Sequence, residues 1–357
     1  MEVHPSQLTP ECVLVSDVFG KTKRPIVLKN TIISEMHIQV LQQFLIDKVE
    51  VAPKLANGAP FYPKERKATN DKIKKIEVQP LIEHYNKTVH AYKKMFWHWQ
   101  SGSYVQIQKV RQLIVPLLER IEEFGLSILE LYLYSNKQDY FYHHSVATSL
   151  LAALLAKRLG IKKEWMQVGI AAFLAESGMA KINRSIFLKK GLLNEAEFKE
   201  IKKHPIYSYR YIEKSSALSK GAKLAILQHH ERLDGTGYPL GVKSDKIHSF
   251  AKIIAVCDTY HAMTSERNYR KSQSPFNVIE QMERDCYQKF NYRIFNKFID
   301  LFASYPLGTK VQLSNGSIGE IVYKEPKFPT RPIVRLENGE MIILKENKSL
   351  YIEQILH

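Results

Sequence analysis

The chain has 357 residues, 45% of them hydrophobic and 25% charged, and its 52 Lys and Arg exceed its 36 Asp and Glu to give a net charge of +16. That length allows two or three domains with their own cores, and the composition excludes an intrinsically disordered chain. The longest nearly uncharged apolar stretch, residues 145–156, is too short to cross a bilayer, which argues against a membrane protein.

The N-terminus, Met-Glu-Val-His-Pro, lacks the basic start and the apolar run of a signal peptide. The three cysteines, Cys12, Cys257 and Cys286, are odd in number and far apart, as expected for free thiols in a reducing compartment. We therefore expect a cytoplasmic protein. The positive charge favours anionic partners, but it does not choose between a nucleotide, a nucleic acid and a membrane surface, and paired lysines are also typical of solvated helix faces.

Residues 1–60 are predicted to form a small α+β module. Short β-prone runs at 12–18 and 25–28 precede a helix-like stretch at 34–46, and residues 48–52 return as a strand.

Residues 61–125 are predicted to be a linker followed by helices, because prolines and a charged run precede a helical, aromatic-rich stretch at 73–99. A second helical stretch carries apolar residues spaced alternately four and three apart: Val110, Ile114, Leu117, Ile121 and Phe124. This heptad-like seam fits a helix packed on the next domain, and it equally fits the coiled coil of a homodimer. Pro116 predicts a kink within it.

Residues 126–303 have the pattern of helices joined by short turns. Asn194 and Glu197 form the signature of a capping box, and His204-Pro205 predicts a helix boundary. Residues 304–357 differ, because Asn-Gly pairs at 315–316 and 338–339 each lie between β-prone runs, the strongest local signal for a hairpin. A small β-rich domain is therefore expected at this end.

Five residues of the helical segment are standard ligands for Fe, Mn, Zn or Ni, and helices that project side chains into a bundle core can assemble such sites. They are His144, His204, His229, His230 and Asp258. The chain has thirteen histidines, so a chance scatter is the alternative. Adjacent residues of a helix diverge by about 100°, so His229 and His230 can serve one cluster only if they straddle it.

The segment after this pair reads His-His-Glu-Arg-Leu-Asp-Gly-Thr-Gly-Tyr-Pro, from His229 to Pro239. This string, followed by Asp258, resembles the HD-GYP domains, a branch of the HD phosphohydrolases. The segments around 139–145, 189–205, 251–258 and 265–270 resemble the family's other motifs, in the same order. The resemblance implies a mostly α fold, in which a helical HD-type domain is flanked by the small α+β module and the small β-rich domain.

The resemblance also implies hydrolysis of the bacterial second messenger cyclic di-GMP by two or three divalent metals that bind the scissile phosphate and activate water. When the family's ligands are assigned by motif position, the resemblance implies that His144 and Asp258 bind one metal. It implies that His204, His229 and His230 bind a second metal beside it. The expected substrate-binding residues are Asp234, Gly237, Tyr238, Pro239, Arg267 and Arg270. The two arginines suit guanine or phosphate, with surface ion pairing as the alternative.

The sequence departs from the family at the adjacent His-Asp pair for which the family is named. Residues 171–179 read Ala-Ala-Phe-Leu-Ala-Glu-Ser-Gly-Met, so Ala175 stands at the histidine position and Glu176 at the aspartate position. Alanine removes one metal ligand, and glutamate lengthens a carboxylate that is expected to bridge two metals and to take part in catalysis. Many members carry a lysine where this chain has Met179; Lys181 is the candidate catalytic lysine in its place, with a surface lysine as the alternative.

Three functions remain open on the sequence. The first is a cyclic di-GMP phosphodiesterase with weakened activity that uses one or two divalent ions, Fe or Mn, or else Zn or Ni. The second is an inactive sensor of cyclic di-GMP, or of a related nucleotide, that signals to protein partners through its terminal domains. The third, supported by charge alone, is a nucleic-acid-binding protein.

Overall fold

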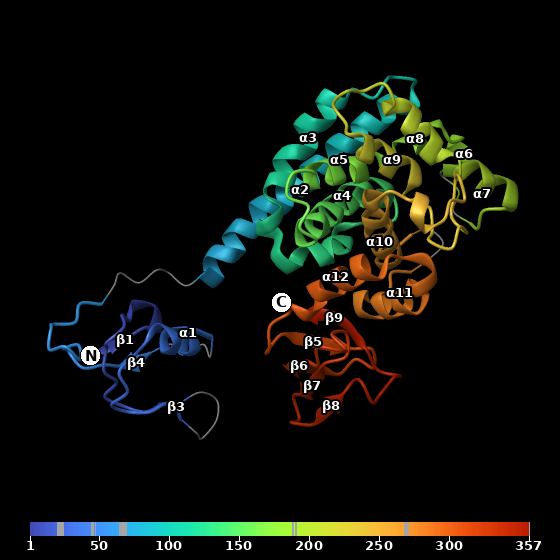
Figure 1. Cartoon of the computed structure of the whole chain (residues 1–357). Helices are drawn as coiled ribbons and strands as arrows, with labels where there is room; N and C mark the ends of the chain where they lie inside the picture. Colours follow the sequence, from blue (N-terminus) through green and yellow to red (C-terminus); the bar gives the residue numbers. More distant parts are fainter. Residues whose placement is uncertain are drawn as a thin grey trace. The chain divides into compact units, whose positions relative to one another are not determined.

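The computed structural model describes residues 1–19, 25–43, 46, 48–63, 70–187, 189, 191–267 and 271–356 (Figure 1). The chain divides into two compact units, Met1–Gln79 and Pro80–His357. Each unit has its own cluster of buried apolar side chains.

The first unit is a small α+β module, as the sequence predicted. Its elements are β1 (Glu2–Val3), the 3-10 helix η1 (Pro5–Gln7), β2 (Val18–Phe19), β3 (Pro25–Val27), α1 (Glu35–Gln43) and β4 (Val49–Glu50). Strand β1 pairs antiparallel with β4, and β2 pairs antiparallel with β3. Within the β-prone run at 12–18, Val13 and Leu14 form isolated bridges to Ile32 and Val51, and a regular strand begins only at Val18.

The second unit is mainly helical. Its α-helices are α2 (Asn70–Gln100, which begins in the first unit), α3 (Ile107–Glu119), α4 (Tyr140–Arg158), α5 (Trp165–Ala175), α6 (Arg184–Phe187), α7 (Glu195–Ile201), α8 (His204–Ile212), α9 (Lys220–Gln228), α10 (Ser249–Thr264), α11 (Pro275–Lys289) and α12 (Tyr292–Ala303). Its 3-10 helices are η2 (Ile121–Tyr134), η3 (Ser177–Lys181) and η4 (Ser244–Lys246). The predicted capping box of α7 is confirmed: Asn194 accepts from the Glu197 backbone N–H, and Glu197 accepts from that of Asn194.

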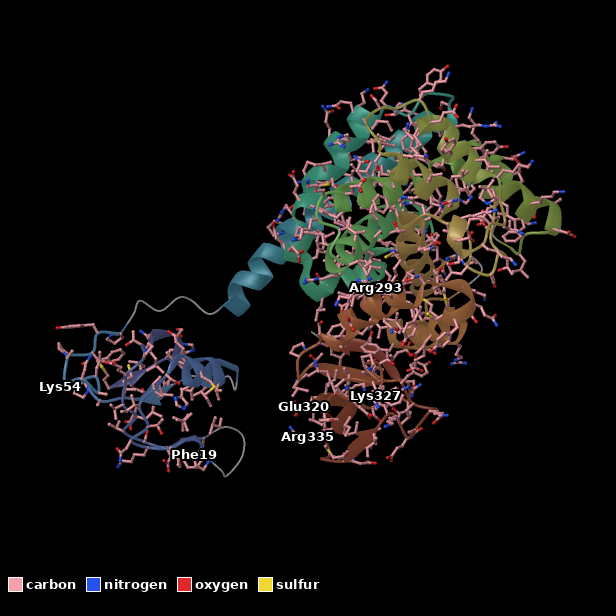
Figure 2. All side chains as sticks on the ribbon, in the orientation of Figure 1. Phe19, Lys54, Arg293, Glu320, Lys327 and Arg335 are labelled. Carbon is pink, nitrogen blue, oxygen red and sulfur yellow. The ribbon has the colours of Figure 1, made fainter. Side chains whose placement is uncertain are left out.

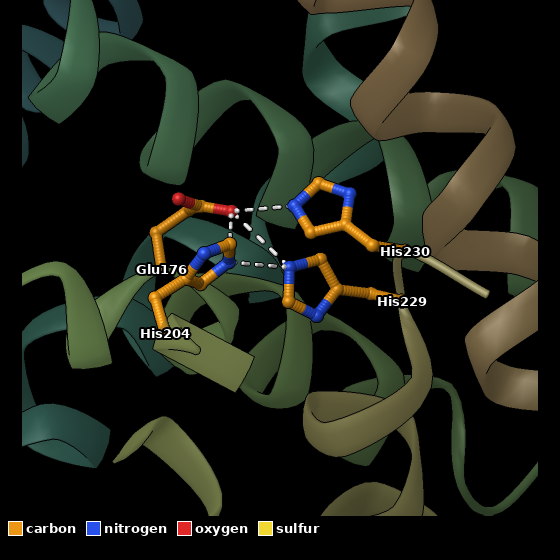
Figure 3. A group of neighbouring side chains, drawn as sticks. All are labelled: Glu176, His204, His229 and His230. Atoms are coloured by element: carbon orange, nitrogen blue, oxygen red, sulfur yellow. Dashed lines mark hydrogen bonds and ion pairs between the residues drawn. The ribbon is translucent and has the colours of Figure 1, made fainter. Parts of the chain in front are cut away.

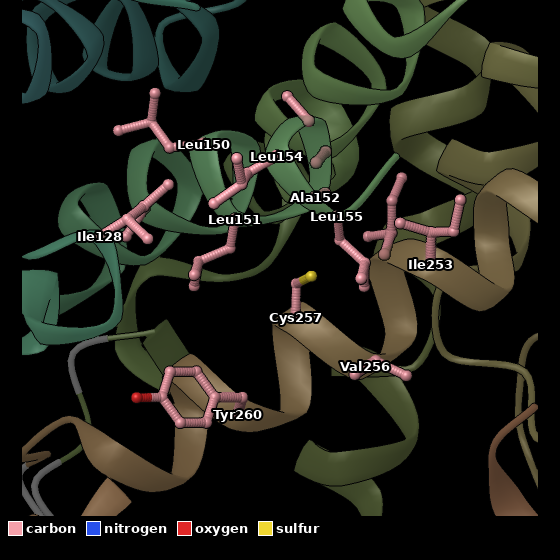
Figure 4. Packing of buried hydrophobic residues seen from close by; sticks show 14 of the residues in the cluster. Ile128, Leu150, Leu151, Ala152, Leu154, Leu155, Ile253, Val256, Cys257 and Tyr260 are labelled. Atoms are coloured by element: carbon pink, nitrogen blue, oxygen red, sulfur yellow. The ribbon is translucent and has the colours of Figure 1, made fainter. Parts of the chain in front are cut away.

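Helix α4 forms the centre of this unit and packs against α5, α10 and η2. Every residue from 142 to 156 is buried, which explains the long apolar run in the sequence: a helix that is apolar on all sides belongs in a core. Figure 4 shows Leu151 and Leu155 of α4 facing Cys257 of α10. Helix α5 approaches closely at Gly169, where an added Cβ would lie 3.0 Å from the Cβ of Ala153.

The heptad-like seam predicted from Val110 to Phe124 packs against other helices of the second unit. Its five apolar residues are all buried, and α3 packs against α5. The helix ends at Glu119, three residues after Pro116, so the seam does not continue as one helix. Of the two alternatives, packing against the adjoining helical domain is confirmed for this seam.

The C-terminal strands are β5 (Lys310–Leu313), β6 (Ile318–Tyr323), β7 (Ile333–Leu336), β8 (Met341–Ile343) and β9 (Ile352–Leu356). They form one antiparallel sheet in the order β8-β7-β6-β5-β9. Both predicted hairpins are present, with Gly316 and Gly339 at positive φ in their turns. Glu320 and Arg335, labelled in Figure 2, face each other across β6 and β7 and form an ion pair.

Within the described residues, no helix combines the length and the apolar character that a membrane span requires.

Candidate metal centre

Six predicted metal ligands come together from five places in the helical unit. Glu176 caps the C-terminus of α5, His204 opens α8, and His229 and His230 follow the last residue of α9. His144 lies on α4 and Asp258 on α10. They form two neighbouring groups that share one residue, Glu176.

The first group contains Glu176, His204, His229 and His230 (Figure 3). Glu176 Oε1 lies 3.3, 3.2 and 3.6 Å from the Nε2 atoms of His204, His229 and His230, respectively. The Nε2 atoms of His204 and His229 are 3.2 Å apart. With metal–ligand bonds of about 2.1 Å, two ligands of a tetrahedral ion are separated by about 3.4 Å. The spacing of these four donor atoms therefore fits a single ion of that size.

In two of these histidines, the ring nitrogen that faces away from Glu176 is hydrogen-bonded to a backbone carbonyl. His204 Nδ1 lies 2.8 Å from the carbonyl of Ile201, and His229 Nδ1 lies 2.8 Å from the carbonyl of Ile226. A carbonyl can only accept, so each Nδ1 carries a hydrogen, and in the neutral ring Nε2 then carries the lone pair. This is the tautomer and the type of outer partner found at metal-binding histidines.

The second group contains His144, Glu176 and Asp258, whose donor atoms lie within 4.8 Å of one another. His144 Nε2 is 2.9 Å from Asp258 Oδ1. The other carboxylate oxygen, Asp258 Oδ2, is 3.7 Å from His230 Nδ1, which links the two groups. This group has three donors, whereas the first has four.

The charges of the two groups favour a cation. Burial opposes ionisation of Glu176, but attraction and hydrogen bonds from His204 and the adjacent histidines hold its pKa well below the usual range. Burial likewise opposes ionisation of Asp258, and His230 and His144 lower its pKa. Burial and the neighbouring His229 lower the pKa of His230 to about 3, so this ring is neutral. Burial opposes protonation of His204, but attraction and a hydrogen bond from Glu176 raise its pKa. Anionic carboxylates facing imidazole nitrogens suit divalent transition metals, which bind in place of such a proton.

The two adjacent histidines reach one group at the end of a helix. Helix α9 ends at Gln228, and His229 is its C-cap, with backbone angles still in the right-handed helical region. The ring centroids of His229 and His230 are 4.0 Å apart, so both rings serve the same group, as the sequence argument required.

The segment with the altered pair is fixed against α8. Ser208 Oγ donates to the carbonyl of Ala175 at 2.6 Å and accepts from the Gly178 N–H at 2.7 Å. A Cβ at Gly178 would lie 2.1 Å from the carbonyl oxygen of His204, so only glycine allows this approach. Ala175 is buried, and its methyl group offers no donor to a metal.

The Gly-Tyr-Pro turn lies beside the first group. The Tyr238 ring is 4.7 Å from that of His230 and 6.3 Å from that of His204, and the Tyr238 N–H donates to the His230 carbonyl. Gly237 is required, because its Cβ would approach the backbone of Glu231 within 2.4 Å. Pro239 follows Tyr238 through a cis peptide bond. The more exposed Asp234 accepts from the backbone N–H and the hydroxyl of Thr236 and does not join the metal-ligand groups.

Glu231 organises this turn, and the sequence reasoning assigned it no role. Its side chain is 2% exposed, and its carboxylate accepts from three consecutive backbone N–H groups, those of Leu240, Gly241 and Val242. The sequence signal that could have identified Glu231 is an acidic residue directly after the paired histidines and before a glycine-rich loop.

Three candidate site residues remain: Lys181, Arg267 and Arg270. Lys181 is exposed, its Nζ lies 5.8 Å from the centre of the Tyr211 ring, and it lines a surface hollow of about 560 Å³ with Trp97 and Arg184. Among the described residues, Lys181 forms no hydrogen bond or ion pair with the metal-ligand groups, and its catalytic role stays a prediction. Arg267 stacks on Tyr140, with its Cζ 4.7 Å from the ring centre. Arg270 lies outside the described residues.

His261 is a second residue that the sequence reasoning missed. It lies on α10 one turn after Asp258, is 1% exposed, and its Nδ1 is 3.1 Å from the Nδ1 of His144. Burial lowers its pKa far below the ordinary value, and repulsion from His144, His143 and Arg267 adds to this. The available signal was a spacing of three residues from Asp258, which places both side chains on one helix face.

Comparison with known proteins agrees with this geometry. Residues 130–291 match the family described as HD domain. The chain is 28% identical over 247 residues to a cyclic di-GMP phosphodiesterase of Pseudomonas aeruginosa, covering 69% of this chain and 59% of that protein. It is 34% identical over 215 residues to a cyclic di-GMP phosphodiesterase of Borreliella burgdorferi, covering 59% and 56%. It is 32% identical over 162 residues to a 3′3′-cGAMP-specific phosphodiesterase of Vibrio cholerae, covering 44% and 35%.

The fold, the clustered ligands and the sequence match together identify residues 130–291 as an HD domain. The turn after the paired histidines and the similarity to cyclic di-GMP phosphodiesterases support the HD-GYP resemblance of this segment. The chain spans less than two thirds of the length of each of these three relatives.

Proposed function

We propose that this chain is a metal-dependent phosphodiesterase for cyclic di-GMP or a closely related cyclic dinucleotide, with turnover reduced by the Ala175-Glu176 pair. The observation that carries the proposal is the position of Glu176. Its Oε1 lies within 3.6 Å of three imidazole Nε2 atoms despite the extra methylene group. The lengthened side chain thus still presents a carboxylate to the three histidines.

We propose one tightly held ion, bound by Glu176, His204, His229 and His230, and a second, weaker ion bound by His144, Glu176 and Asp258. Three imidazoles with carboxylates suit Fe or Mn, and also Zn or Ni. When bound, such ions polarise a phosphate oxygen and lower the pKa of water.

The chain's own residues supply the rest of the proposed site. Glu176 is shared by both groups, so its carboxylate sets their separation. The Tyr238 ring forms a wall beside His230, and Glu231 holds the turn that carries it. Arg267 offers a planar guanidinium suited to phosphate or guanine. Residues 126–303 would form the site-bearing domain, flanked by 1–60, the 61–125 connection and 304–357, with partner contacts on the terminal modules.

We expect the second group, His144, Glu176 and Asp258, to bind its metal ion weakly. It has three donors, and the neighbouring Ala175 provides no fourth. Two-metal hydrolysis depends on both ions, so partial occupancy of the weaker position lowers turnover. The same observation supports the alternative function, a sensor that binds the dinucleotide and does not cleave it.

Three measurements on the purified chain separate these functions. Metal content is measured after reconstitution with Mn²⁺ or Fe²⁺, affinity is measured for cyclic di-GMP and 3′3′-cGAMP, and linear dinucleotide product is followed by chromatography. Metal-dependent product that disappears in His229→Ala, but persists when the exposed His98 is replaced by alanine, supports the enzyme. Tight binding without product supports the sensor. Absence of dinucleotide binding, together with salt-sensitive binding of DNA or RNA, would contradict both.

A further inference from the structure

The second group contains a contact between two imidazoles. His144 Nδ1 and His261 Nδ1 are 3.1 Å apart, and both rings are buried. Ser265 Oγ also lies 3.2 Å from His261 Nδ1. A hydrogen bond between two such nitrogens requires that one carries the hydrogen and the other the lone pair.

The role proposed for His144 decides the direction of this hydrogen bond. Its Nε2 lies 2.9 Å from Asp258 Oδ1 and donates to this carboxylate when no metal is bound, whereas binding a metal requires a free lone pair on Nε2. The hydrogen must then be on Nδ1, so His144 donates and His261 accepts. His261 in turn carries its own hydrogen on Nε2, a buried atom with no hydrogen-bond partner among the described residues.

His144 differs in this respect from His204 and His229. Those two rings donate to the carbonyls of Ile201 and Ile226, which are part of the backbone. His144 depends on a side chain, which one substitution can remove. The Tyr140 ring stacks on both His144 and His261, at centroid distances of 5.3 and 6.4 Å, and keeps the two imidazoles side by side.

We propose that His261 is a positioning residue: by accepting the Nδ1 hydrogen of His144, it directs the Nε2 lone pair of His144 towards the weaker metal position. The inference rests on the proposed metal centre. Outer partners of metal-binding histidines typically change metal affinity by about 10- to 100-fold. Because His261 touches only the second group, the loss should be confined to the weaker ion.

The test uses two substitutions of similar size, His261→Leu and His261→Asn. Leucine fills the space without an acceptor, whereas the amide oxygen of asparagine can accept from His144 Nδ1. The apo proteins are titrated with Mn²⁺ against a competing chelator, and bound metal is counted by mass spectrometry. The wild-type chain should show a tight and a weaker class of ion.

His261→Leu should weaken the weaker class by about 10- to 100-fold and leave the tight class within about threefold, while His261→Asn keeps both. Ser265→Ala, which removes the competing donor to His261, should also keep both. The inference is overturned if leucine and asparagine behave alike, if Ser265→Ala reproduces the loss, or if the wild-type chain binds only the tight class. Should the two classes respond as expected while no dinucleotide is cleaved, the proposed hydrolysis fails and the positioning role stands.

Discussion

Replacing Glu231 by alanine removes the acceptor that holds the Gly-Tyr-Pro loop. The carboxylate accepts the N–H groups of Leu240, Gly241 and Val242 at 2.7, 3.2 and 3.2 Å. Each hydrogen bond to a charged group contributes about 1.5–3 kcal/mol, but Leu240 and Gly241 are exposed, so water replaces part of this. We expect a net cost of about 3 kcal/mol for opening the loop.

That cost corresponds to about 100-fold faster hydrogen exchange at these three amides. Glu231→Gln keeps one acceptor oxygen and should give about a tenfold increase. Asp234→Asn is the matched control in the same loop, because among the described residues the Asp234 side chain accepts hydrogen bonds from Thr236 alone. Unchanged exchange at 240–242 in Glu231→Ala, or an equal effect of Asp234→Asn, would refute the role assigned to Glu231.

Three further changes probe the metal centre and its loop. His229→Ala removes a donor of the first group and should lower metal affinity by more than about 100-fold, the upper range for outer partners, as measured by chelator competition. Ala175→His combined with Glu176→Asp should raise occupancy of the weaker ion and the rate of hydrolysis; an unchanged rate would place the defect elsewhere in the site. Gly237→Ala puts a Cβ within 2.4 Å of backbone and should cost about 2 kcal/mol in urea unfolding, whereas Gly191→Ala, with open space around its Cβ, should cost less than half of that.

The fold was largely predictable because its signals are local. The Asn-Gly turns, the capping box at Asn194 and the all-apolar helix α4 each depend on residues close in sequence. The seam of α3 was ambiguous for a physical reason: an apolar stripe shows that a helix is covered, but not whether the covering surface belongs to the same chain. Only the tertiary structure identifies α5 as that surface.

The site was predictable where motifs mark it and hidden where it depends on contacts between distant segments. His144, His204 and Asp258 were assigned through the family resemblance, and they converge in the structure. His261 was missed because its significance is a contact with α4, 117 residues away. Lys181 was chosen by its proximity in sequence to the altered pair, but η3 turns it towards Tyr211.

The position of Glu176 is the reason to expect that the altered pair affects the two proposed ion positions unequally. Ser208 joins the carbonyl of Ala175 to the N–H of Gly178, so the backbone on either side of Glu176 is fixed. The added methylene therefore extends the carboxylate outward from a fixed base. Its Oε1 meets His204 and His229 at 3.3 and 3.2 Å, so the first group has four donors, whereas the second group has three and Ala175 adds none. Shortening the side chain alone would draw it away from the intact histidines, which is why Glu176→Asp must be tested together with the restored histidine.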